Sequence, residues 1–189
     1  MIVIGLLGAI ALIVISAINP IEQSNRARDT RYKSDGSQLI SAIERYYTQK
    51  SEFPWQTLTP ATYQSADAAF PFVTGADPNV GLCTTLLCVA DGLLLTNDEL
   101  KSEFRNRDFA KGNPTGVKRI LVGKAIGSSS SVYACFTPLS KSVRDKACTD
   151  GDVYTIAGST RTQIPAGNAN CAATSLTWTS APQYVCLPE

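Results

Sequence analysis

The chain begins with a long run of hydrophobic residues that no charge interrupts. Residues 1–21 contain no acidic or basic side chain, and the first charged residue is Glu22. As an α-helix that rises about 1.5 Å per residue, residues 1–18 reach about 27 Å, which is close to the hydrocarbon thickness of a bilayer. The pattern therefore predicts an apolar helix over residues 1–21 that crosses a membrane once.

Two other interpretations of residues 1–21 are weaker. A cleaved secretory signal has a basic segment before its apolar run and a small-residue cleavage site after it, and this sequence shows no such basic segment and no clean site. A buried core helix would need protein around its whole circumference, which a chain of 189 residues hardly provides. We favour the membrane span, and the signal peptide and the core helix remain as alternatives.

Beyond Pro20 the helical pattern resumes with a single apolar face. Its positions recur at steps of three and four, namely Tyr32, Gly36, Leu39, Ile43 and Tyr46. This period predicts an amphipathic helix over residues 22–53, which ends near Pro54 because the residue before a proline disfavours helical backbone. Pro20 lacks a backbone donor, so it is expected to kink or locally unwind the helix. Leu39, Ile43 and Tyr46 are predicted to pack against a sheet.

The rest of the chain, residues 54–189, is predicted to form a globular head. Residues 54–116 are mostly irregular, with a short helix that Thr96 caps and Glu99 supports three residues later. Residues 117–189 contain short β-rich runs between turn-forming residues, namely VKRILVG, SVYACFT, DVYTIAG, SLTWTS and QYVCL. The sequence thus predicts an α+β fold: a long N-terminal helix, apolar in its first half and amphipathic in its second, packed against a C-terminal antiparallel sheet.

One of these runs shows the alternation of a half-buried strand. Three positions with apolar side chains, Val132, Ala134 and Phe136, face one side. They alternate with Tyr133, Cys135 and Thr137, which face the other. We expect the first set to lie against the apolar face of the amphipathic helix.

Composition argues against several classes of function. Histidine is absent, which removes the commonest general base and most zinc sites, so an enzyme is not expected and we predict no catalytic, cofactor-binding or metal-binding residue. The formal net charge is only +1, which does not indicate a nucleic-acid-binding protein. The acidic residues Asp150 and Asp152 lack the spacing of a calcium loop, and a solvated turn explains them better.

The cysteines indicate disulfides in an oxidising compartment. There are six of them, Cys83, Cys88, Cys135, Cys148, Cys171 and Cys186. Their spacing matches neither a zinc ribbon nor a redox motif, and an even number scattered through a Gly/Ser/Thr-rich body is typical of disulfides outside the cytoplasm. Six cysteines allow 15 pairings. We predict the pairing that closes the smallest loops: Cys83–Cys88, Cys135–Cys148 and Cys171–Cys186.

The charges after the apolar run conflict with this location. Four basic residues follow it, Arg26, Arg28, Arg31 and Lys33. The positive-inside rule would hold these residues in the cytoplasm, whereas the cysteines place the head outside. A basic leader upstream of Met1 that is later removed would resolve the conflict, and we expect the gene to encode such a leader together with an acidic residue.

These features together resemble one family. The stretch IVIGLLGAIALIVISAINP, followed by RARDTRYKSDGSQLISAIERYYTQKSEFP, is similar to the N-terminal region of bacterial type IV pilins and pseudopilins. The resemblance covers about the first 55 residues. The mature family start, a methylated Phe followed by Thr, Leu, Ile or Leu, and Glu, is not present in this chain. We therefore assign the role of that glutamate to no residue.

The resemblance implies a structural role. It implies a major pilin that lies in the cytoplasmic membrane before assembly and polymerises into a helical surface filament used in adhesion, twitching motility or DNA uptake. A prepilin peptidase and the pilus assembly machinery would be its partners, with DNA or a host-cell surface as further candidates. The apolar residues expected in the filament core are Ile4, Leu7, Ile10, Leu12 and Ile15, together with Pro20. The alternatives are a minor pilin or pseudopilin of a secretion or competence system, and a single-pass membrane-anchored extracellular binding module.

Overall fold

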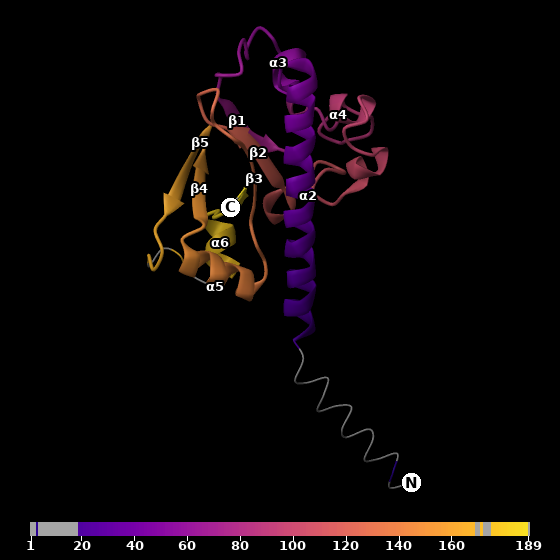
Figure 1. The fold of residues 1–189 in the computed structure, drawn as a ribbon. Coiled ribbons are helices and arrows are strands. Elements are labelled where there is room, and N and C mark those ends of the chain that lie inside the picture. The colour runs from indigo at the N-terminus through magenta and orange to yellow at the C-terminus, as the bar shows by residue number, and fades with distance from the viewer. Residues whose placement is uncertain (1–2, 4–18, 169–170, 172–174, 189) are drawn as a thin grey trace.

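A single long helix, α2, organises the molecule. The computed structural model describes residues 3, 19–168, 171 and 175–188. Helix α2 spans Pro20–Lys50, begins after the N-cap Asn19 and ends where Ser51 adopts a left-handed backbone conformation. Figure 1 shows a β-sheet and the β4–β5 hairpin on one flank of α2 and the loops around α4 on the other.

Short helices and strands follow α2 along the chain. The α-helices are α3 (Pro54–Leu58), α4 (Leu93–Thr96), α5 (Lys141–Asp150) and α6 (Ser175–Ser180). The strands are β1 (Phe70–Thr74), β2 (Ile120–Lys124), β3 (Val132–Phe136), β4 (Val153–Ala157), β5 (Thr160–Ile164) and β6 (Val185–Leu187). Three short 3₁₀ turns, η1 (Pro78–Val80), η2 (Ser102–Asn106) and η3 (Gly116–Lys118), lie between β1 and β2.

The strands form two antiparallel sheets. The larger sheet has the order β1-β2-β3-β6, and the smaller is the β4–β5 hairpin. A bridge between Tyr154 and Tyr184 links the hairpin to the segment that leads into β6. The prediction of a long helix with an antiparallel sheet and disulfides is confirmed. The segment 54–116, predicted to be mostly irregular, nevertheless supplies strand β1, because Phe70 pairs with Lys124 of β2 and is buried in the core.

Helix α2 packs on one face of the larger sheet through the apolar face that its period predicts. Leu39, Ile43 and Tyr46 are all buried in the main core. The three alternating apolar residues of β3 belong to the same core, as expected from the sequence. Gly36 allows the helix to come close, since a Cβ at this position would lie 3.3 Å from the Ala134 side chain.

A stack of aromatic rings closes the core at the C-terminal end of α2. Tyr47 stacks on Phe53 with ring centroids 4.4 Å apart, Phe53 on Trp55 at 4.6 Å, and Trp55 on Phe70 at 4.3 Å. Offset aromatic pairs add to the stability that burial of their area provides. The stack connects α2, α3 and β1 into one packed unit.

Two elements differ from their sequence-based predictions. Thr96 was expected to start a helix but ends α4, while Glu99 is buried and accepts hydrogen bonds from Arg45 and Gln49 of α2. The run SLTWTS was expected to be a strand but forms α6, in which Trp178 is fully buried against a cluster that includes Val153. In both cases a contact with a distant element outweighs a local preference.

Candidate assembly surface

The residues predicted for a filament core lie mostly outside the described part of the chain. Ile4, Leu7, Ile10, Leu12 and Ile15 are not among the described residues. In the portion that is described, no helix has both the length and the apolar character that crossing a membrane requires. Pro20 is described and occupies the first helical position of α2, where its missing N–H costs nothing. The backbone of Asn19 before it is extended, and α2 begins at Pro20.

Glu22 connects the start of α2 to the start of α5. Its carboxylate accepts hydrogen bonds from the Ser140 hydroxyl at 2.6 Å, from the Lys141 amide at 3.0 Å and from the Ser142 amide at 3.2 Å. Those amides belong to the first turn of α5, where no intrahelical partner exists. Burial raises the pKa of Glu22, but these hydrogen bonds outweigh burial and lower the pKa to about 2.

Asp29, two turns further along α2, holds the residues just before α5. Its carboxylate accepts from the Leu139 amide at 3.0 Å and from the Ser140 amide at 2.8 Å, and Arg28 donates to it at 2.9 Å. The side chain is fully buried. Burial raises the pKa of Asp29, against the opposing effect of these donors. We call this set, Glu22 and Asp29 with residues 139–142, the α2–α5 junction.

The disulfides confirm one predicted pair and correct two. Cys83 pairs with Cys88, as predicted. The predicted pairs Cys135–Cys148 and Cys171–Cys186 are wrong, because Cys135 pairs with Cys186 and Cys148 with Cys171. The reason is the sheet: β3 and β6 are neighbours, and Cys135 lies directly opposite Cys186 in their register. The Cys148–Cys171 bond joins α5 to the segment before α6.

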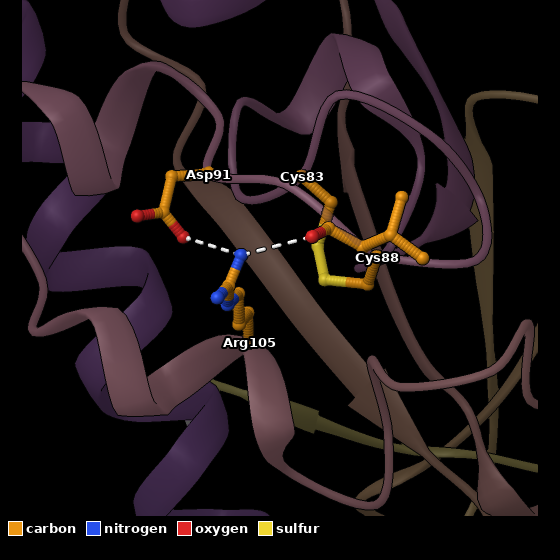
Figure 2. The surroundings of a disulfide bond; sticks show 5 residues. Cys83, Cys88, Asp91 and Arg105 are labelled. Atoms are coloured by element: carbon orange, nitrogen blue, oxygen red, sulfur yellow. Dashed lines mark hydrogen bonds and ion pairs between the residues drawn. A yellow bond between two sulfur atoms is a disulfide. The ribbon is translucent and has the colours of Figure 1, made fainter.

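The small disulfide loop, residues 83–89, is held rigidly at its base. Figure 2 shows Arg105 between Asp91 and this loop, with interactions to both. Its guanidinium donates to the carbonyl of Val89 at 3.0 Å and lies 3.2 Å from the Asp91 carboxylate. The Gly112 amide donates to the Leu87 carbonyl at 3.1 Å. Covalent and hydrogen bonds therefore fix the backbone of the loop on both sides.

This loop presents apolar side chains to solvent. Leu87 is 58% exposed and Val89 is 68% exposed, and Leu86 between Cys83 and Cys88 is also exposed. Single exposed apolar side chains are common, but a cluster on a rigid loop marks an interaction surface more often than chance placement does. The sequence contains the signal in the apolar residues of CTTLLCVA, yet only the structure shows that they point away from the core.

A second apolar surface covers the side of the larger sheet that faces away from α2. It consists of half-buried side chains around the Cys135–Cys186 bond, namely Phe72, Tyr133, Tyr154, Ile156 and Tyr184. Arg161 of β5 lies on this surface, with its guanidinium carbon 3.6 Å from the centre of the Tyr133 ring and 4.2 Å from that of Tyr154. We call these five residues with Arg161 the outer sheet face.

Beside the outer sheet face lies a groove of about 360 Å³. The loop between β2 and β3 and the turn between β4 and β5 form its walls, and its lining residues are Phe72, Ala125, Ile126, Ser129, Ser130, Ser131, Tyr133, Ser159, Thr160 and Arg161. Ile126 is 78% exposed at its rim. The lining therefore combines two aromatic rings, those of Phe72 and Tyr133, with five Ser and Thr side chains and the Arg161 guanidinium.

The described residues offer no site for a metal ion. Within residues 19–168, 171 and 175–188, no three side chains of Cys, Asp or Glu gather as metal ligands would. The carboxylate of Asp150 instead pairs with Lys146 on the surface of α5.

Comparisons of the chain with protein-family models, with characterised proteins and with solved structures find no match.

Proposed function

We propose that this chain is a structural subunit of a type IV pilus-like filament, a major pilin that polymerises through its apolar N-terminal residues. The observation that carries the proposal is the exposure of the N-terminal end of α2 beyond the head. Ile21 is 72% exposed, and Pro20 and Gln23 beside it are also exposed, so the head leaves much of this end of the helix uncovered. Figure 1 shows this end of α2 extending beyond α5.

The α2–α5 junction supports the same proposal. Backbone amides at the start of α5 donate hydrogen bonds to Glu22 and Asp29 and so hold α2 in place. Glu22 directly follows the uncharged run of residues 1–21. Apolar residues at the uncovered end of an anchored helix need either lipid or copies of themselves. In a pilin, lipid surrounds these residues while the subunit lies in the cytoplasmic membrane, and copies of the same residues surround them once the filament has formed. A prepilin peptidase and an assembly machinery would be the partners of this subunit. We propose no catalytic role.

Electron microscopy of sheared surface material, combined with mass spectrometry, tests the proposal. We expect thin filaments in which this chain is the dominant protein. Filaments in which it is a rare component would favour the minor pilin or pseudopilin. Its recovery only as a membrane-bound monomer would overturn the filament proposal and favour an anchored binding module, a function for which the exposed apolar loop would also be suited.

A further inference from the structure

We propose that the disulfide loop, residues 83–89, docks into the groove beside the outer sheet face of a second copy of this chain. This inference rests on the proposed filament and names the contact between neighbouring heads. The loop supplies a small apolar projection, and the groove supplies the aromatic rings of Phe72 and Tyr133 and the exposed side chain of Ile126.

The loop has the properties of a prepared contact. Its backbone is fixed by the Cys83–Cys88 bond and by the hydrogen bonds from Arg105 and Gly112, so little conformational freedom remains to be lost when it binds. The side chains of Leu87 and Val89 are exposed to water. Their burial against a partner would lower the free energy, because apolar area would be removed from water.

The groove has a complementary chemistry. Phe72 and Tyr133 form its apolar base, and Ile126 stands at its rim. The only charged side chain among its described lining residues is Arg161. The loop, residues 83–89, carries no charged side chain, and the carboxylate of Asp91 beside it is paired with Arg105. The loop therefore brings no positive charge of its own against Arg161.

The arrangement of the two surfaces favours a copy of the same chain. Figure 1 shows α4, which follows the loop in sequence, on one flank of α2 and the β4–β5 hairpin, whose turn forms a wall of the groove, on the other. A contact between two different surfaces on opposite flanks cannot close upon itself in a pair. Repeated with a constant rotation and rise, it generates an open helical assembly.

The position of the loop argues against a lipid partner. The segment after the loop is tied to the C-terminal half of α2, where Arg45 donates to Glu99 at 2.8 Å. Arg45 lies about 37 Å along the helix axis from Pro20, given a rise of about 1.5 Å per residue. The loop itself is bonded through Leu87 to Gly112, in a segment whose Arg107 pairs with Asp35, about 22 Å along the helix axis from Pro20 at about 1.5 Å per residue, so lipid that holds residues 1–18 would not reach it.

Photo-crosslinking in assembled filaments of the full chain tests this contact. A benzoylphenylalanine at Leu87 should crosslink to residues 125–133 or 159–161 of a neighbouring copy, as peptide mapping by mass spectrometry would show. The same group at Glu44, an exposed residue of α2, serves as the matched control and should not reach those segments. Filaments in which Leu87 crosslinks elsewhere, or to another protein, would overturn the inference and leave the filament proposal intact.

A charge on the loop gives a second test. Leu87→Lys and Ile126→Lys should each lower the filament yield about tenfold, because each would bury a second positive charge beside Arg161, which costs more than the 1.4 kcal/mol that corresponds to this factor. Both residues are exposed, so the thermal midpoint of the subunit should stay the same, which excludes misfolding as the cause. Normal filament yield from both variants would contradict the contact. Absence of filaments from the unmodified chain would instead contradict the proposed function.

Discussion

The pKa values of the two carboxylates in the α2–α5 junction shift in opposite directions, although both accept hydrogen bonds from the same backbone segment. Glu22 meets the free amides of a helix start while keeping contact with water, so hydrogen bonding dominates and its pKa falls. Asp29 receives comparable donors but is fully buried, so loss of hydration dominates and its pKa rises. Ionisation therefore favours the folded state at Glu22 and opposes it at Asp29.

Glu22→Gln should destabilise the protein at neutral pH but not in acid. The folded-state pKa of Glu22, about 2, lies below its ordinary value of 4.5, so its contribution is present above pH 4.5 and is lost as the pH falls toward 2. We expect a loss of about 1 kcal/mol at pH 7, typical of a helix cap. Urea denaturation of the full chain in detergent at pH 7 and pH 3 measures it, with Glu44→Gln as control. A deficit of equal size at both pH values would contradict this role.

Asp29→Ala should destabilise the protein over the whole pH range. The change leaves the amides of Leu139 and Ser140 without their acceptor, and an unpaired buried donor costs about 1–3 kcal/mol whatever the charge of the lost group. The same denaturation series measures it, and Asp145→Ala on the exposed side of α5 is the control. An effect below a few tenths of a kcal/mol would show that water replaces the carboxylate.

At the scale of elements, two of the disulfides differ in what they stabilise. Cys135–Cys186 ties β3 to β6 across 51 residues of sequence, whereas Cys83–Cys88 spans a separation of only 5. In the chain-entropy model the constraint on the unfolded chain grows with loop length. The long-range bond therefore stabilises the fold, and the short one mainly shapes the loop that it closes.

Removal of each bond should separate these tasks. Replacing both Cys135 and Cys186 with Ala should lower the free energy of unfolding by about 4 kcal/mol, and replacing both Cys83 and Cys88 with Ala by about 2 kcal/mol. Denaturation midpoints under non-reducing conditions give the comparison. Hydrogen exchange of residues 84–91 should rise sharply in the second variant alone. A larger loss of stability from the short loop than from the long one would reverse this assignment.

At the scale of the whole molecule, the head and the N-terminal run have separate requirements. The head has its own core, three disulfides and an anchored helix. The run of residues 1–18 is nearly uniformly apolar and needs lipid or other copies around it. Folding of the head and assembly of the filament should therefore respond to different substitutions.

Leu12→Asp should block filament assembly without unfolding the head. An unpaired charge among packed apolar helices costs several kcal/mol. Thr48→Asp, at an exposed position of α2, is the matched control and should assemble normally. Electron microscopy of cells that carry each variant shows whether filaments form.

A chain that begins at Asn19, which keeps the cap of α2 and Glu22, should be a soluble monomer in light scattering. Filaments formed by this shortened chain would contradict the pilin proposal.

Local pattern alone determined several features of this protein. The period of the apolar residues identified the packing face of α2, since helix geometry brings positions three and four apart onto one side. The alternation in β3 identified its inward side for the corresponding reason in a strand. The Cys83–Cys88 pair was predictable because the two residues are too close in sequence to be far apart in space.

Tertiary structure alone decided the features that depend on partners distant in sequence. The partner of Cys135 follows from the pairing of β3 with β6, which joins residues 51 apart. Glu22 and Asp29 acquire their roles from α5, more than 100 residues later, and α6 is a helix because Trp178 fills a pocket that several elements build. These outcomes depend on contacts that no local window contains, because the free energy of burial and pairing arises only when the chain has brought those segments together.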